Sequence, residues 1–120
     1  RKGLTIMPMI QVKLTIPVSA EQDVKLHTAL TNAVVDIFHK PIEYVMVHVE
    51  KEADLWMAGQ KLSKGVYLSA SLMGEIKNED CDLFTAKVCE IFKNEFDIEG
   101  TQVYTTFQSI NQWGWDSKIL

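Results

Sequence analysis

The sequence is poor in cysteine, with only Cys81 and Cys89 in 120 residues. Both fall on one predicted helix at a spacing too long for a CxxC redox pair, and the histidines supply no zinc-binding pattern. We therefore expect two buried free thiols, no metal site and no cofactor. A reducing cytosol is then the expected compartment.

Two further features are lacking, a long apolar run and a surplus of basic residues. A membrane-spanning helix needs about 20 apolar residues, and no run approaches that length, so we expect no membrane insertion. The net charge is −4, whereas binding to a phosphate backbone requires a basic surface, so nucleic acid is not an expected partner. Residues 1–6 begin with basic side chains but are too few for a signal peptide.

What the sequence does have is the composition of a folded domain. Hydrophobic residues make up 47% and charged residues 23% of the chain, which is typical of globular proteins and unlike a disordered segment. A chain of 120 residues suits one domain and leaves little room for a second.

The first half of the chain has a strand–helix–strand pattern. Apolar residues occupy every second position from Leu4 to Ile16, which is the period of a strand with one buried face. Ser19 and Gln22 have the spacing of a capping box, and apolar residues then recur at helical spacing until Lys40-Pro41. The alternating valines at positions 45–49 predict a second strand.

The second half repeats this order. After a weakly patterned connection, Glu50–Gly65, we expect a strand at Val66–Met73, a helix from about Glu79 to Phe96 and a strand at Gln102–Gln108. The predicted fold is therefore α/β: two β-α-β repeats form a four-stranded mixed sheet with two helices on one face, and each repeat has parallel outer strands. The other face lacks cover, which predicts association with further copies.

Several short motifs then occur in a specific order. They are Met7-Pro8-Met9-Ile10, His39-Lys40-Pro41, Tyr44-Val45-Met46-Val47-His48-Val49, Ser71-Leu72-Met73-Gly74-Glu75-Ile76, Val103-Tyr104 and Trp113-Gly114-Trp115. Together they resemble the macrophage migration inhibitory factor family of the tautomerase superfamily, over almost everything from Met7 onward. The resemblance implies a homotrimeric barrel and keto–enol tautomerase activity of the phenylpyruvate or dopachrome type. It also implies cytokine-like activity in some members.

The resemblance assigns catalytic roles to Pro8, Lys40 and Tyr104. Pro8 matches an N-terminal proline that acts as the base, Lys40 a lysine that binds the substrate carboxylate, and Tyr104 a tyrosine that reaches into a neighbouring subunit's pocket. Without the resemblance, each has a plainer structural interpretation: a proline at a strand edge, a cation at a helix C-terminus and an aromatic residue in a strand.

The resemblance also places Met73, Thr106 and Trp115 around the substrate. Met73 and Trp115 match apolar pocket walls, although as isolated residues both are ordinary core residues. Thr106 stands where family members often have asparagine, so one polar contact differs. His48 is interpreted as a structural strand residue.

The main departure from the family pattern lies ahead of Pro8. We divide the chain into residues 1–7, an N-terminal extension with an initiator-type Met7, and residues 8–120, a single domain. Within this chain the Pro8 nitrogen is an amide and cannot act as a base. Either the active protein begins at Pro8, or the extension is native and the protein no longer uses the proline as a base.

Two functions follow from these alternatives. The first is a tautomerase that moves a proton between the keto and enol forms of a small α-keto acid. The second is a cytokine-like binding protein with a vestigial pocket, whose partner is a cell-surface receptor and whose catalysis the extension blocks. An unrelated α/β oligomerisation module is a third interpretation. The expected location is cytoplasmic, with secretion that needs no signal peptide as the alternative.

Overall fold

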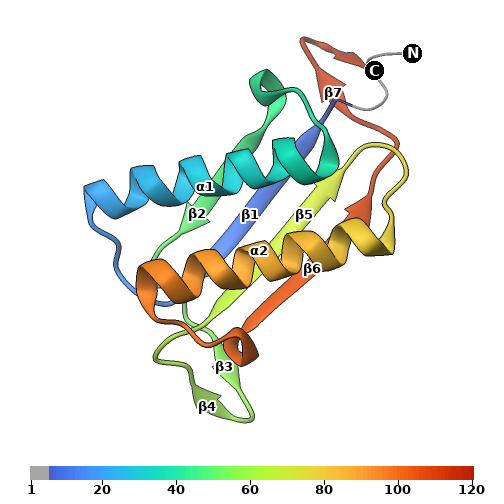
Figure 1. Ribbon diagram of the computed structural model, residues 1–120. Coiled ribbons are helices and arrows are strands. Elements are labelled where there is room, and N and C mark those ends of the chain that lie inside the picture. Colours follow the sequence, from blue (N-terminus) through green and yellow to red (C-terminus); the bar gives the residue numbers. More distant parts are fainter. Residues whose placement is uncertain (1–5) are drawn as a thin grey trace.

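A four-stranded sheet forms the centre of the computed structural model, which describes residues 6–120 (Figure 1). Its strands, in the order β2-β1-β5-β6, are β2 (Met46–Glu50), β1 (Pro8–Leu14), β5 (Val66–Leu72) and β6 (Val103–Ser109). Strand β1 runs parallel to β2, and β5 runs parallel to β6, while the central pair β1–β5 is antiparallel. The predicted mixed sheet with two parallel pairs is confirmed.

Two helices, α1 (Ala20–Phe38) and α2 (Asn78–Phe96), lie side by side across one face of this sheet (Figure 1). Every second residue of β1 and β5 points into the core beneath them. The largest fully buried side chains of the two helices are Leu26, Leu30, Val34, Phe84, Val88 and Phe92. Burying one such aliphatic or aromatic side chain contributes about 1.5–3 kcal/mol, so this layer supplies much of the folding free energy.

The capping box predicted at Ser19 is present. The Ser19 hydroxyl accepts the backbone N–H of Gln22 at 3.1 Å, and the Gln22 side chain accepts the backbone N–H of Ser19 at 3.2 Å. These bonds satisfy two N–H groups that the first turn of a helix leaves without partners.

Replacing Ser19 with alanine removes one of these bonds. We expect Ser19→Ala to lower the free energy of unfolding by about 1 kcal/mol, measured by urea denaturation. Thr28→Ala, at an exposed position inside the same helix, is the control and should not destabilise the protein. An equal loss in both variants would contradict the capping role.

Two short hairpins were not predicted from the sequence. Strands β3 (Trp56–Met57) and β4 (Gln60–Lys61) form a hairpin within the weakly patterned connection before β5. Strands β7 (Gly114–Trp115) and β8 (Lys118–Ile119) form another in the tail. Strands of two residues are too short to show the alternation of polar and apolar residues on which the prediction relied.

The strand and helix boundaries otherwise differ from the predictions by small amounts. The first strand is shorter than expected, since Met7 and Thr15 lie outside β1. Leu4, where the predicted strand began, lies outside the described residues. Both cysteines are free, as expected, but they are partly exposed on α2 and not buried, which corrects that prediction. Cys89 nevertheless packs against the hydrophobic core.

The sheet face opposite the helices is largely polar. Gln11, Lys13, His48 and Glu50 are exposed there, and Tyr67 hydrogen-bonds to Thr106 at 2.8 Å between their hydroxyl oxygens. Polar side chains of this kind are typical of a surface that contacts water or other polar groups. Among the described residues, no helix is long and apolar enough to cross a membrane.

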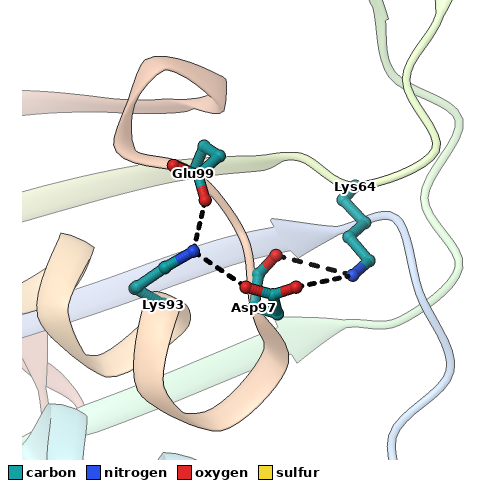
Figure 2. A network of polar contacts seen from close by, with 4 residues as sticks. All are labelled: Lys64, Lys93, Asp97 and Glu99. Carbon is teal, nitrogen blue, oxygen red and sulfur yellow. Dashed lines mark hydrogen bonds and ion pairs between the residues drawn. The ribbon is translucent and has the colours of Figure 1, made fainter.

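A cluster of charged side chains surrounds the connection from α2 to β6 (Figure 2). Lys93 binds both Asp97 and Glu99, and Lys64 pairs with Asp97 at 3.6 Å. These pairs tie the end of α2 to the short helix η3 (Gly100–Gln102), which leads into β6. Because all four side chains are about half exposed or more, we assign the cluster a small effect on stability.

Candidate functional site

Lys40 follows directly after the end of α1, where the chain turns sharply. Its predecessor His39 caps the helix with φ at 57°, in the left-handed region. After this turn Lys40 is only 8% exposed, and its Nζ donates a hydrogen bond to the carbonyl oxygen of Met73 at 2.8 Å. Burial disfavours the charged ammonium and lowers the pKa of Lys40 below the ordinary lysine value.

Met73 joins Lys40 to the start of β1. The backbone N–H of Met73 donates to the carbonyl oxygen of Met7 at 3.1 Å, while Pro8 lies opposite Leu72 in the antiparallel ladder. Pro8, Lys40 and Met73, which are far apart in the sequence, therefore meet where β1 begins and β5 ends. Met7, Pro8 and Met73 are all buried, so these residues meet Lys40 in a buried part of the protein.

Pro8 opens β1 and is itself buried. The first residue of a strand is a position at which proline is tolerated, because it has no N–H to donate to the ladder. Its nitrogen forms the peptide bond with Met7, and resonance removes the basic lone pair. In the 120-residue chain this nitrogen therefore cannot accept a proton.

The hairpin of β7 and β8, which carries Trp115, lies near the end of the sheet at which β1 begins (Figure 1). The Trp115 ring packs edge-on against Tyr44, with the ring centroids 5.6 Å apart and the planes at 75°. Tyr44 lies in the short helix η2 (Ile42–Tyr44), just after Lys40 and Pro41. Sequence reasoning missed Tyr44 as a site residue, although it is part of a motif that carried the family resemblance.

Within one chain, neither Tyr104 nor Thr106 lies next to Pro8. Tyr104 pairs with Tyr67 and Pro8 with Leu72 on the shared strand β5, which separates the two positions by roughly 17 Å along the strand alone. Tyr104 is 61% exposed, and Thr106 is engaged by Tyr67. If these residues serve a site that contains Pro8, that site belongs to another copy of the chain.

His39 is a second residue that sequence reasoning missed. Its side chain is exposed. The role of His39 is therefore in its backbone, whose left-handed conformation turns the chain so that Lys40 points inward. A β-branched residue adopts this conformation at a cost of about 1–2 kcal/mol.

We therefore expect His39→Val to lower the free energy of unfolding by about 1–2 kcal/mol. His39→Gly should be neutral or slightly stabilising, because glycine adopts this conformation freely. Thermal unfolding of the two variants checks the expectation. Equal stability of the valine and glycine variants would show that the backbone conformation is not limiting.

The potential for metal binding is low in the part of the chain that the structure describes. Over residues 6–120, no group of three or more histidine, cysteine, aspartate or glutamate side chains could hold a metal ion. The candidate site consists of one amine, one proline, backbone carbonyl groups and apolar or aromatic side chains. Such an arrangement is suited to proton transfer and to binding a small anion.

Comparison with known proteins agrees with this fold. The family model described as macrophage migration inhibitory factor matches residues 7–118. The crystal structure of Leishmania major MIF2 has a TM-score of 0.87 at 17% identity, covering 97% of this chain and 99% of that one. Macrophage migration inhibitory factor of Toxoplasma gondii has a TM-score of 0.86 at 18% identity, covering 93% and 99%.

A third similar structure is that of Pt0534 inactivated by 2-oxo-3-pentynoate. It has a TM-score of 0.82 at 18% identity, covering 92% of this chain and 94% of that one. A comparison with curated protein sequences finds no match. At these identities the structural likeness establishes the fold alone.

Proposed function

The chain belongs to the macrophage migration inhibitory factor family, and from that premise we propose that it is a keto–enol tautomerase acting on small α-keto acids. Pro8 would be the base once its nitrogen is a free N-terminal amine. The observation that carries the proposal is the convergence of Pro8, Lys40 and Met73 at one end of the sheet.

A free prolyl nitrogen is a suitable base at this position. It is a secondary amine, and an α-amino group starts from a pKa of about 7.7–8.0. The buried position of Pro8 and its neighbour Leu72 would disfavour the charged form and lower that pKa toward neutrality. A base with a pKa near the working pH abstracts a proton from carbon and returns it most effectively.

Lys40 would bind the substrate carboxylate and stabilise the enolate. Its Nζ donates to the Met73 carbonyl oxygen, and an ammonium group is a positively charged donor that suits a carboxylate. As the proton leaves the α-carbon, negative charge develops on the keto oxygen. A cation held in apolar surroundings stabilises that charge more strongly than the same cation in water.

The substrate class is supported by a chemical comparison. Pt0534, which has a similar fold, was inactivated by 2-oxo-3-pentynoate, a carboxylate with a keto group on the adjacent carbon. We propose the same class of compound for this chain because Lys40 offers a cation for the carboxylate. The aromatic pair of Tyr44 and Trp115 would form an apolar flank for the remainder of the substrate.

We further propose that the site is completed in a homotrimer. The two edge strands carry the exposed apolar residues Met46 on β2 and Tyr104 on β6, at 66% and 61% exposure. A neighbouring sheet edge would cover them and would bring Tyr104 and Thr106 toward a Pro8 that is not their own. Heterologous contacts of this kind close into a ring when the rotation between copies allows it.

The trimer is tested by light scattering at micromolar concentration. We expect a mass three times that of the chain, and Tyr104→Asp should shift it toward the monomer because it introduces a charge into the interface. A stable monomer of the unmodified chain would remove the shared site. Glu75→Asp, a conservative change at an exposed residue, should leave the mass unchanged.

The second candidate function is a cytokine-like binding protein, with a cell-surface receptor as its partner and without catalysis. The amide at the Pro8 nitrogen favours it, because that form lacks the proposed base. A tautomerase assay with an enolisable aromatic α-keto acid separates the two candidates. Activity in a form that begins at Pro8 supports the enzyme, and absence of activity in every form supports the binding protein.

A further inference from the structure

Tyr67 and Thr106 are hydrogen-bonded to each other on the sheet face opposite the helices. Tyr67 belongs to β5 and Thr106 to the neighbouring edge strand β6, and their hydroxyl oxygens lie 2.8 Å apart. Both residues are half-buried, so water competes less for this bond than at a fully exposed position. Strand β5 also holds Gln108 of β6, because the Ser69 hydroxyl donates to Gln108 Oε1 at 3.0 Å. Side chains of β5 therefore fix polar side chains of the edge strand.

This bond determines what the Thr106 hydroxyl can offer to a second partner. A threonine hydroxyl has one hydrogen to donate and two lone pairs that accept, and it rotates to suit its neighbours. Either oxygen could be the donor in this pair, and a phenolic hydroxyl is a stronger hydrogen-bond donor than an aliphatic one. The favoured arrangement is therefore Tyr67 donating to Thr106. It leaves the Thr106 hydrogen available and directs it away from Tyr67.

An α-keto acid is the kind of partner that such a hydroxyl suits. At neutral pH its carboxylate and keto oxygens accept hydrogen bonds and donate none. Thr106 stands where relatives often have asparagine, whose amide nitrogen carries two hydrogens to donate. A threonine has a single hydrogen, so it replaces that donor only if the hydrogen points toward the ligand.

We propose that Tyr67 is a positioning residue: by donating to Thr106, it presents the Thr106 hydrogen to an acceptor oxygen of an α-keto acid bound by a neighbouring copy. The inference rests on the proposed function and adds to it a residue that the family resemblance did not indicate. A donor that is already oriented loses less entropy when the ligand arrives. Each of two linked hydrogen bonds also polarises and strengthens the other. Tyr67 therefore contributes to affinity without touching the ligand.

Thr85 and Thr105 form a matched pair within the same chain. Their hydroxyl oxygens are also 2.8 Å apart, and both residues are half-buried. Thr85 lies on α2, and Thr105 directly precedes Thr106 on β6. Because successive side chains of a strand point to opposite faces, Thr105 points toward the helices and Thr106 away from them. The Thr85–Thr105 bond is therefore the same kind of contact on the face that has no part in the proposed site.

The experiment measures the binding of benzoylformate by isothermal titration calorimetry, both in the 120-residue chain and in the form that begins at Pro8. Benzoylformate is an aromatic α-keto acid that cannot enolise, so it binds without being turned over. We expect Tyr67→Phe to raise its dissociation constant about two- to tenfold, which is the usual effect of losing one hydrogen bond between neutral groups. Thr106→Val should raise it at least as much. Adding Tyr67→Phe to Thr106→Val should have little further effect, because Tyr67 acts only through Thr106.

Thr85→Val is the control and should leave the dissociation constant unchanged. Thr106→Ser keeps the hydroxyl, so Tyr67→Phe should weaken binding in that background too, and this variant serves if Thr106→Val does not fold. Unchanged binding in Tyr67→Phe, effects of Tyr67 and Thr106 that add in full, an equal loss in Thr85→Val, or no binding to either form overturns the inference. Coupled loss of binding in a protein without tautomerase activity would support the inference and contradict the proposed enzyme. Turnover of an enolisable α-keto acid with binding indifferent to Tyr67→Phe would do the reverse.

Discussion

A form of the protein that begins at Pro8 is expected to interconvert the keto and enol forms of an aromatic α-keto acid about 100- to 10,000-fold faster than the 120-residue chain. This is the usual contribution of a positioned general base. In the longer chain the Pro8 nitrogen is part of a peptide bond with Met7, and its lone pair is delocalised. The rate is measured for both forms side by side, from the absorbance of the enol.

The control is Pro8→Gly in the short form. It keeps an N-terminal amine but replaces the rigid secondary amine, and we expect most of the activity to be lost. Equal activity in the long and short forms would mean that another group is the base, with Lys40 as the first to test. Activity of the long form above that of the short form would contradict the role of Pro8 outright.

Replacement of Lys40 is expected to give the second large effect. In the active short form, Lys40→Met should lower kcat/KM for α-keto acids by about 10- to 100-fold, because a hydrogen bond to a charged group contributes about 1.5–3 kcal/mol. Methionine retains the length of the buried side chain, whereas alanine would also leave a cavity beside Met73. Steady-state kinetics with matched thermal unfolding separates the loss of binding from a loss of folding.

The substrate itself provides the control for Lys40. The methyl ester of the same keto acid has no carboxylate charge, so the variant and the unmodified enzyme should differ much less on the ester. Affinity for the acid should also fall as the pH rises through the pKa of Lys40. That pKa lies below the ordinary lysine value, so the loss should begin at a lower pH than for an exposed lysine. An equal reduction of kcat/KM for the acid and the ester would mean that Lys40 has a structural role and does not bind the carboxylate.

Much of the fold was predictable because its signals are local. The alternation along β1, the capping box at Ser19 and the stop at Pro41 each follow from the residues that form them. The hairpins at 56–61 and 114–119 were not predictable, since strands of two residues show no period. Their conformation depends on positive φ at residues such as Ala58 and Asp116, and neither residue type signals that reliably.

The candidate site was predictable only in part. The resemblance named Pro8, Lys40 and Met73, and the structure brings these three together. It could not show that Lys40 is buried against a backbone carbonyl, because the residues of that contact are far apart in sequence. Nor did periodicity indicate that His39 turns the chain at that point or that Tyr44 packs against Trp115.

The central claim is that the freed Pro8 nitrogen is the reactive amine of the site. It is tested most directly by treating the form that begins at Pro8 with 2-oxo-3-pentynoate and locating the adduct by peptide mass spectrometry. The compound carries an alkyne conjugated to a ketone, which a neutral amine attacks to form a new C–N bond. We predict one adduct per chain on the Pro8 nitrogen, with loss of tautomerase activity in proportion to labelling. Loss of activity with Pro8 unmodified and the adduct on another residue would contradict the claim.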